Sequence, residues 1–372
     1  MQQALYAPGL GYYTGHVGQF GDFGSNSDFV TAPELSPLFG QTLAAQIGRV
    51  LQHTGLQTVV EFGAGSGKLA AQVLGELDRM GCAPRHYAIV ELSGALKHRQ
   101  MQTLRDAVPH LAERVQWWRT LPEAFEAVIL GNEVLDAMPV KLLTRQPDGW
   151  FERGVTQEGD DLIFADHATT LMPPQPEAHA LPVGTVTEIH PQALGFVRTL
   201  ADRLSRGVAL FIDYGFPQHE YYHPQRHMGT LRAHYRHRAL DDVLLWPGLT
   251  DITAHLDFTA LALTAQNAGL DVLGYTSQAS FLLNCGLLDR VAEAFAAGPP
   301  PVAPSSAAAL SKALQAKEGA LGGSHYLRQT AAVNKLMNES EMGELFKVIA
   351  IGRGVDAQLL HGFRRGDRTH TL

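Results

Sequence analysis

Three alternating glycines stand between an apolar run, Thr58–Phe62, and a helical pattern that begins at Lys68. Glycines let the backbone come close to a ligand, and a helix that starts there offers free N–H groups. A dinucleotide site reads GxGxxG, whereas this turn reads GxGxG with an acid two residues before its first glycine. That order suits a ligand with an amino-acid end and no pyrophosphate, and we interpret the ligand as S-adenosylmethionine. The expected contacts are Glu61, Gly63, Gly65 and Gly67, and a tight turn without a ligand is the alternative.

An acidic residue also closes the next apolar run, since Glu91 follows directly after Val90. In such sheets an acid at the tip of the second strand accepts hydrogen bonds from the ribose hydroxyls of a nucleotide. We therefore expect Glu91 and its neighbour Leu92 to border the sugar. In the N-terminal segment, Thr31 and Glu34 have the spacing of a helix capping box, and we expect them to contact the same cofactor.

An amide and two carboxylates follow the fourth apolar run, because Asn132, Glu133 and Asp136 lie in the stretch GNEVLDAMPV. Ligands of open α/β folds bind at the carboxyl ends of the strands, so these side chains are expected at the cofactor cleft. Asn132 is predicted to bond the cofactor. Glu133 and Asp136 are predicted to hold a cationic nucleophile or to accept its proton. The alternative is a capped helix start with solvated acids.

Later segments add a third group of candidates. Glu188 precedes a helical pattern, Asp213 closes the fifth apolar run, and His255 lies between Asp251 and Asp257. Taken singly, such residues are more often structural than catalytic. Together they are predicted to line the substrate side of one cleft, with Glu188 and His255 as further catalytic candidates.

Alternating strand and helix patterns position these residues. The alternation predicts an α/β fold with a parallel sheet and right-handed crossovers. The last two apolar runs are separated by a long helical segment, which predicts an antiparallel edge hairpin. The predicted strands are 58–62, 86–90, 115–118, 127–130, 207–214, 272–277 and 346–351, and the predicted helices include 38–53, 68–79, 93–107, 191–206 and 257–269.

The predicted organisation has five parts. Residues 1–55 are a Gly- and aromatic-rich loop followed by a helix, which cover the cofactor site, and the core comprises 56–139 and 183–277. Residues 140–182 combine a hairpin signal with an acidic, Pro-rich stretch and are predicted to form an inserted accessory region. Two further parts follow: a C-terminal helical segment with the last strand, 278–354, and a polar tail, 355–372, predicted to be disordered.

Composition narrows the class of protein. The chain has 372 residues, 45% of them hydrophobic, and a net charge of −8, which argues against a nucleic-acid protein with a basic face. The basic run 226–238 is interpreted as a solvated loop or helix. The two cysteines are far apart and no HExxH spacing occurs, so neither a disulfide nor a metal site is predicted. No signal pattern and no run of 18 apolar residues occurs, so we expect no membrane insertion and a cytoplasmic location in a bacterium.

These segments resemble the MidA-type family of methyltransferases, which includes the mitochondrial complex I assembly arginine methyltransferase. The resemblance implies a Rossmann-like class I methyltransferase sheet, with S-adenosylmethionine at the glycine turn and S-adenosylhomocysteine as product. It also implies that an arginine of a protein, a respiratory complex I subunit, is methylated, and that residues 132–139 lie at the active cleft. It implies the mitochondrial matrix for a eukaryotic protein, and a homodimer is left open. The matching stretches are ALYAPGLGYY, GDFGSNSDFVTAPELSPLFG, VVEFGAGSGKLA, GNEVLDAMPVK, FIDYGF, GTLRAHYRHR, PGLTDITAHLDFTAL and MGELFKVIAIGRG.

The chain departs from the family pattern at both ends. Family members carry further residues, including a helix, ahead of ALYAPGLGYY, so we expect a truncated or misassigned start and a weakened lid over the cofactor. The tail after Gly354 does not match the pattern either.

The favoured mechanism passes a methyl group in line from the sulfonium to an arginine nitrogen. Carboxylates can hold a guanidinium bidentately, and Glu133 is the first choice for that role, ahead of Asp136 and Glu188. Two other functions are weighed. One is an assembly protein that binds S-adenosylmethionine without turnover, and the other, which the GxGxG spacing disfavours, is a nicotinamide dehydrogenase.

Overall fold

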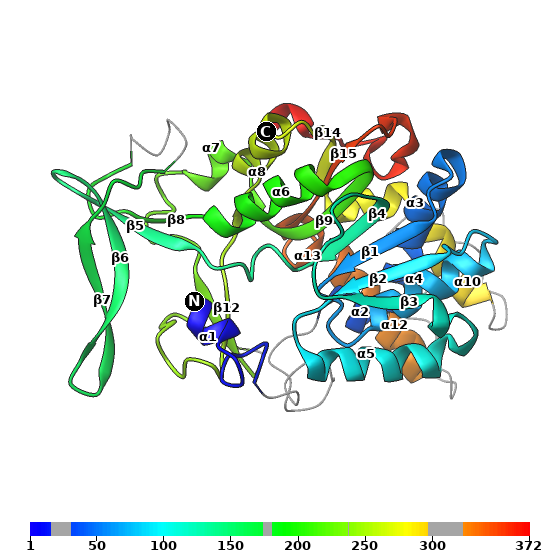
Figure 1. Ribbon diagram of the computed structural model, residues 1–372, viewed down its shortest axis with the longest axis horizontal. Coiled ribbons are helices and arrows are strands. Elements are labelled where there is room, and N and C mark those ends of the chain that lie inside the picture. Colours follow the sequence, from blue (N-terminus) through cyan, green and yellow to red (C-terminus); the bar gives the residue numbers. More distant parts are fainter. Residues whose placement is uncertain (16–30, 174–180, 237, 297–322) are drawn as a thin grey trace.

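The computed structural model of the chain describes residues 1–15, 31–173, 181–236, 238–296 and 323–372. Within these ranges, the centre is an eight-stranded sheet of order β14-β15-β9-β4-β1-β2-β3, with β13 (Leu256–Asp257) paired to β9. Figure 1 shows this sheet on one side of the molecule and a separate antiparallel arm extending from the other. The α/β class predicted from the sequence is confirmed.

Neighbouring strands are parallel over the larger part of this sheet. The predicted bounds of β1, β2, β3 and α4 are confirmed to the residue, because each apolar run is bounded by residues that favour turns or caps. The strands are β1 (Thr58–Phe62), β2 (His86–Val90), β3 (Val115–Trp118), β4 (Phe125–Asn132) and β9 (Leu204–Phe216), and the first connections include α4 (Lys68–Arg79), α5 (Gly94–Ala107) and η2 (Pro109–Arg114).

The other end of the sheet is antiparallel, since β15 (Phe346–Arg353) lies between β9 and β14 (Asp271–Ser277) and pairs with both. The predicted edge hairpin is therefore confirmed. The Ala-rich stretch 303–321, part of the predicted C-terminal helical segment, lies outside the described residues. Between β14 and β15 the chain forms α9 (Gln278–Asn284), α10 (Leu287–Ala296), α12 (Gly323–Met337) and α13 (Met342–Leu345).

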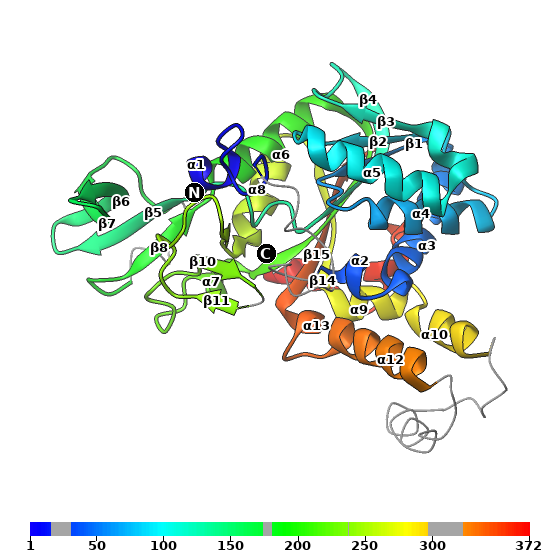
Figure 2. The same ribbon diagram turned by 90° about the horizontal axis from the view of Figure 1, so that it is seen from below.

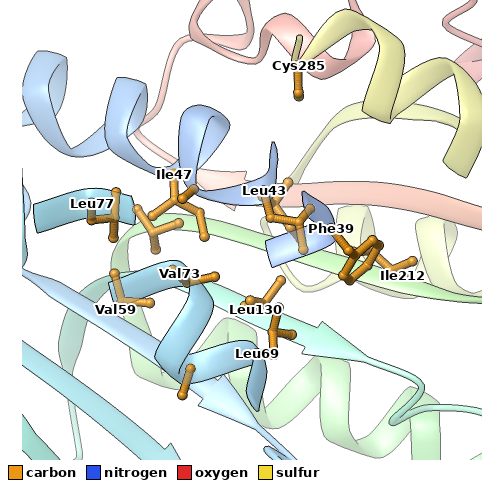
Figure 3. Packing of buried hydrophobic residues seen from close by; sticks show 14 of the residues in the cluster. Phe39, Leu43, Ile47, Val59, Leu69, Val73, Leu77, Leu130, Ile212 and Cys285 are labelled. Atoms are coloured by element: carbon orange, nitrogen blue, oxygen red, sulfur yellow. The ribbon is translucent and has the colours of Figure 1, made fainter. Parts of the chain in front are cut away.

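Two hydrophobic layers cover the faces of the sheet. In one layer, Phe39, Leu43 and Ile47 of α3 lie beside Val59 and Leu130 of the sheet (Figure 3). The other layer is formed by α6 and α8. Successive strand residues alternate between the two layers, because neighbouring side chains of a strand point to opposite faces. The helices are α2 (Ala32–Leu35), α3 (Pro37–Thr54), α6 (Pro191–Arg203) and α8 (Phe258–Asn267).

The accessory region is larger and more regular than predicted. Its four strands have the order β7-β6-β5-β8, and Figure 2 shows them projecting away from the core. Part of the acidic, Pro-rich stretch forms regular structure, since β7 pairs with β6 along its length and Glu158 pairs with Asp161 across a two-residue turn. The region also extends past residue 182 to β8. The strands are β5 (Lys141–Gln146), β6 (Gly149–Glu158), β7 (Asp161–Ala168) and β8 (Val186–Ile189).

A second small sheet packs against the N-terminal segment near the core (Figure 1). Leu5 and Tyr12 from the N-terminal segment are buried against Ala233 and Ile252 of this sheet. The basic run 226–238, interpreted as a solvated loop or helix, thus contains a strand, Arg232–Tyr235. The elements are α1 (Gln2–Tyr6), α7 (Gln218–Tyr221), β10 (Arg232–Tyr235), β11 (Arg238–Leu240) and β12 (Asp251–Thr253).

The prediction of a disordered tail is wrong. Phe363 is buried with its ring centroid 5.2 Å from that of Phe281, and Leu360 is also buried. The side chain of Gln46 bonds the backbone of Leu359 and Gly362 and so fastens the tail to α3. The disorder was predicted from the polar composition of the tail, although a few apolar residues pack this segment against the rest of the protein. Its turns are η4 (Ala357–Leu359), η5 (His361–Phe363) and η6 (Thr369–Thr371).

Candidate active site

A cavity of about 730 Å³ lies at the carboxyl ends of β1, β2 and β4. Its wall comes from the turns that follow these strands, from α2, from the N-terminal segment and from β10 and β12. This is the position at which open parallel sheets bind their ligands. The structure therefore brings most of the residues predicted from separate motifs to one place.

The glycine turn forms one wall of the cavity. Gly63, Gly65 and Gly67 have φ angles of 62°, 50° and 85°, a backbone region that L side chains rarely adopt. A Cβ atom on Gly65 would meet no atom within 4 Å, whereas one on Gly67 would lie 2.9 Å from the Cα of Gln100. Gly63 and Gly65 line the cavity and Gly67 does not. Gly67 therefore shapes the turn and its packing against α5, and its direct contact with the cofactor stays a prediction.

Glu61 lies at the base of the cavity and is almost fully buried. The hydroxyl of Tyr87 donates a hydrogen bond to its Oε2 atom at 2.5 Å. Burial raises the pKa of Glu61 to about 7, against the effect of this hydrogen bond. A cationic ligand group nearby, such as the ammonium of an amino-acid end, would favour the ionised form of Glu61.

Glu91 and Leu92 border the cavity as predicted for the sugar end of the ligand. One oxygen of Glu91 accepts from the Ser93 N–H at 2.8 Å, and the other accepts from Nε2 of Gln100 at 2.9 Å. These donors fix the carboxylate without using all of its lone pairs. The side chain of Leu92 is 76% exposed, so it is available to pack on a flat ligand surface.

Thr31 and Glu34 also line the cavity. The spacing of Thr31 and Glu34 suggested a capping box, but the side chain of Thr31 does not cap the helix. The carboxylate of Glu34 instead accepts hydrogen bonds from the Ser66 hydroxyl and the Lys68 ammonium. Glu34 therefore ties the N-terminal segment to the glycine turn, and direct contact with the cofactor stays a prediction.

The acid loop, residues 132–139, carries the strongest chemical signals. The Nδ2 atom of Asn132 donates to Oε1 of Glu133 at 2.9 Å, and the hydroxyl of Tyr214 reaches Oε2 at 3.4 Å. The Oδ1 atom of Asn132 is buried and has no hydrogen-bond partner among the described residues. A buried acceptor of this kind usually finds a donor, so a ligand N–H suits it.

Asp213 stabilises the conformation of the acid loop through hydrogen bonds to its backbone. Its Oδ2 atom accepts from the backbone N–H groups of Val134, Leu135 and Asp136 at 3.2, 2.8 and 3.3 Å. Glu133 has a φ of 54°, and its own N–H donates to the carbonyl of Ile212 at 2.9 Å. The loop therefore aims Glu133 into the cavity at the expense of an unfavourable backbone angle. An acid at the tip of the fifth strand was the signal for Asp213.

The carboxyl groups here are poorly solvated and close to one another. Burial raises the pKa of Glu133 to about 8, and the charges of Asp213 and Asp251 raise it too, against hydrogen bonds from Asn132 and Tyr214. Burial first, and then Asp213, Glu133 and Asp251, hold the pKa of Asp136 well above its usual range. Neither Glu133 nor Asp136 forms an ion pair with any residue that the structure describes. The site is therefore electrostatically suited to a cation.

Tyr6 and Tyr13 are among the residues of the cavity wall that were absent from the predicted contacts, and Asp251, predicted only as part of the third group, also lines the cavity. The hydroxyl of Tyr13 donates to Oδ1 of Asp251 at 2.7 Å. The aromatic density of the N-terminal segment and the acid before His255 were the available signals. No local pattern indicated that these distant segments meet.

Glu188 lies outside the cavity, which corrects its prediction as a cleft residue. Its carboxylate accepts from the backbone N–H groups of Thr230 and Leu231 at 2.7 and 3.0 Å and from the Tyr221 hydroxyl at 3.0 Å. Glu188 therefore joins the accessory sheet to the segment that leads into β10. The sequence shows that residue 188 is acidic, but it does not show which groups donate hydrogen bonds to its carboxylate.

His255 also lies behind the cavity wall and does not line it. Its ring stacks on Tyr214 with centroids 5.8 Å apart and planes 10° from parallel. Burial, followed by the charges of Arg226, Arg232 and Lys347, lowers its pKa to about 4, so the imidazole is neutral at neutral pH. The structure thus gives His255 a supporting position behind Tyr214.

The donors and acceptors of the cavity suit S-adenosylmethionine. Asn132 offers a buried acceptor for its ammonium, and Glu91 offers lone pairs for its ribose. Within the described ranges, no group of three or more His, Cys, Asp or Glu side chains is placed to hold a metal ion. Across the same ranges, the helices are all too short or too polar to cross a membrane.

Comparison with known proteins identifies the family of the chain. Residues 42–276 match the model of Methyltransf_28, a family described as S-adenosyl-L-methionine-dependent methyltransferases. Mitochondrial protein arginine methyltransferases NDUFAF7 are similar: the Mus musculus protein is 31% identical over 97% of this chain and 81% of its own length. For the Homo sapiens protein these values are 31%, 77% and 69%.

A solved structure is similar over the whole chain. The crystal structure of a COG1565 superfamily member from Burkholderia thailandensis, bound to S-adenosyl-homocysteine, has a TM-score of 0.88 and 50% identity, covering 100% of this chain and 90% of that one. These findings confirm the class I methyltransferase fold and the cofactor expected from the sequence. The chain belongs to the Methyltransf_28 family and is an S-adenosylmethionine-dependent methyltransferase.

Proposed function

We propose that this methyltransferase modifies an arginine side chain of a protein. The observation that carries the proposal is the pair of buried carboxyl groups, Glu133 and Asp136, which line the cofactor cavity without an ion pair among the described residues. A guanidinium is permanently charged and presents its N–H donors in a planar fork that fits a carboxylate. The names of the NDUFAF7 relatives support arginine as the acceptor.

Each cavity residue then has a proposed task. Glu61 and Asn132 hold the amino-acid end of the cofactor, and Glu91 with Leu92 holds the nucleoside end. Bound S-adenosylmethionine supplies an electrophilic methyl group on its sulfonium. Glu133 orients one guanidinium nitrogen and accepts the proton that this nitrogen releases once it carries the methyl group. By the family resemblance, the proposed acceptor protein is a subunit of respiratory complex I.

Replacing Glu133 by Gln tests the proposal, because the amide keeps the shape of the side chain and removes its charge. We expect methyl transfer to fall by about 100-fold or more, with the affinity for S-adenosylhomocysteine changed by less than about threefold. Methyl-labelled cofactor and a cell extract provide the assay, and mass spectrometry identifies the labelled residue.

The matched control is Glu123→Gln, an exposed acid outside the cavity. This variant should methylate at the wild-type rate. Wild-type activity in Glu133→Gln, or a methyl group on a residue other than arginine, would contradict the proposed function.

A further inference from the structure

Asp251 is a buried carboxyl group that reaches the cavity from a different element than the acid loop. It lies at the start of β12, in the small sheet that packs on the N-terminal segment. The N–H of Ala254 donates to the backbone carbonyl of Asp136 at 3.0 Å, which ties the end of β12 to the acid loop. Carboxyl groups from two independent segments therefore share one cavity.

Two stacked tyrosines from the N-terminal segment join these segments a second time. The hydroxyl of Tyr6 donates to the carbonyl of Ala137 at 3.0 Å, and that of Tyr13 donates to Oδ1 of Asp251 at 2.7 Å. The two rings stack with centroids 5.4 Å apart and planes 23° from parallel. Tyr6 thus contacts the acid loop and Tyr13 orients Asp251. The ring stack therefore sets the distance between the acid loop and Asp251.

We propose that Asp251, oriented by Tyr13, is a specificity-determining residue that binds the guanidinium edge left open by Glu133. The inference rests on the proposed function and adds a second contact from β12. A guanidinium has five N–H donors, and one carboxylate can engage only two of them in a fork. A second carboxylate on a separate element can therefore grip another edge and select the cation over a neutral group of the same shape.

The electrostatics of the surrounding groups agree with this assignment. Glu133, Asp136 and Asp251 line the same cavity, and the charge of Asp251, in addition to burial, raises the pKa of the other two groups. His234 is a basic residue of the same sheet and lies opposite Asp251 in the pairing of β10 with β12. Burial and Arg232 lower the pKa of His234, which is therefore neutral at neutral pH. Besides burial, the charge of Asp251 also raises the pKa of Tyr6, Tyr13 and Tyr214.

A pair of matched ligands tests the assignment without knowledge of the acceptor protein. Both are S-adenosylhomocysteine analogues with nitrogen in place of sulfur; one carries a 2-guanidinoethyl arm and the other a neutral 2-ureidoethyl arm. The common part anchors them in the cofactor site, so the ratio of their dissociation constants measures the preference for a cation. Isothermal titration calorimetry on the full chain gives that ratio.

We expect the wild-type protein to bind the guanidino analogue more tightly, and Asp251→Asn to reduce this preference about tenfold. The affinity for S-adenosylhomocysteine should stay unchanged in the variant. Tyr13→Phe keeps the ring stack and removes the hydroxyl that orients Asp251, so a smaller reduction, about threefold, is expected. Asp241→Asn, an exposed acid of the same segment, should keep the wild-type preference.

The outcomes separate the two proposals. A wild-type protein without preference for the guanidino arm contradicts the arginine acceptor itself. A wild-type preference that survives fully in Asp251→Asn overturns only the role of Asp251. Loss of S-adenosylhomocysteine binding in Asp251→Asn also overturns that role, because it places the residue on the cofactor side or in the framework of the fold.

Discussion

At the scale of single residues, the acid loop combines backbone strain with buried charge. Glu133 adopts a φ of 54°, a region that costs a residue with a Cβ atom about 1–2 kcal/mol relative to its usual conformation. The surrounding bonds from Asp213 and to Ile212 hold the loop in this shape. Strain of this kind persists where the direction of a side chain matters more than local stability.

The strain predicts an unusual order of stabilities for two variants of this residue. Both Glu133→Gly and Glu133→Ala remove the carboxylate, but only glycine adopts the observed angle without cost. We expect the glycine variant to have a free energy of unfolding about 1 kcal/mol higher than that of the alanine variant. Urea denaturation of the two proteins measures the difference. An alanine variant as stable as the glycine variant would show that the loop relaxes.

At the scale of elements, strands and helices with strong periodicity were predictable, and those held by distant partners were not. The apolar runs of β1, β2 and β3 are bounded by clear breakers, so their limits could be predicted from the sequence. The segment of β7 was judged by its acidic and proline content, and its short apolar run, residues 162–165, was not recognised as part of a strand. Asp251 and Tyr13 are 238 positions apart, and no local pattern reports a contact over that distance. The same reason explains why Glu188 was placed in the cleft.

The ordered tail makes a prediction at this scale. Phe363 is buried against Phe281, so Phe363→Ala should lower the free energy of unfolding by about 3 kcal/mol. Arg365 lies on the same segment with an exposed side chain, and Arg365→Ala should change stability by less than about 0.5 kcal/mol. Thermal and urea denaturation compare the two variants. Equal stabilities would mean that the tail contributes little to the fold.

At the scale of the whole molecule, buried acids couple folding to pH. Burial raises the pKa of Glu133 to about 8, so the folded state binds this proton more tightly than the unfolded chain, whose glutamates titrate near 4.5. The protonated carboxyl group therefore contributes its full stabilisation to the folded state below about pH 4.5. This stabilisation is lost as the pH rises through about 8. Other groups titrate as well, and a comparison with a variant isolates this one.

We expect the stability of the wild-type protein relative to Glu133→Gln to fall steadily between pH 5 and pH 8 in the absence of ligand. The amide does not titrate, so the difference between the two unfolding curves reports the carboxyl group of Glu133 together with its effect on the pKa of Asp136. Urea denaturation at several pH values gives the curves. For Glu123→Gln the difference from wild type should stay constant. A constant difference for Glu133→Gln would mean that this carboxyl group is solvated in the folded protein.

The place of β15 in the sheet also bears on the order in which the chain can be completed during synthesis. β15 lies between β9 and β14 in the sheet, although both of those strands precede it in the chain. While the nascent chain still lacks residues 346–353, the long edge of β9 has no neighbour on that side and β14 has no route into the sheet. Open strand edges invite pairing with other chains. We therefore expect a chain that still lacks the last strand to pair with other chains more readily than the complete chain does.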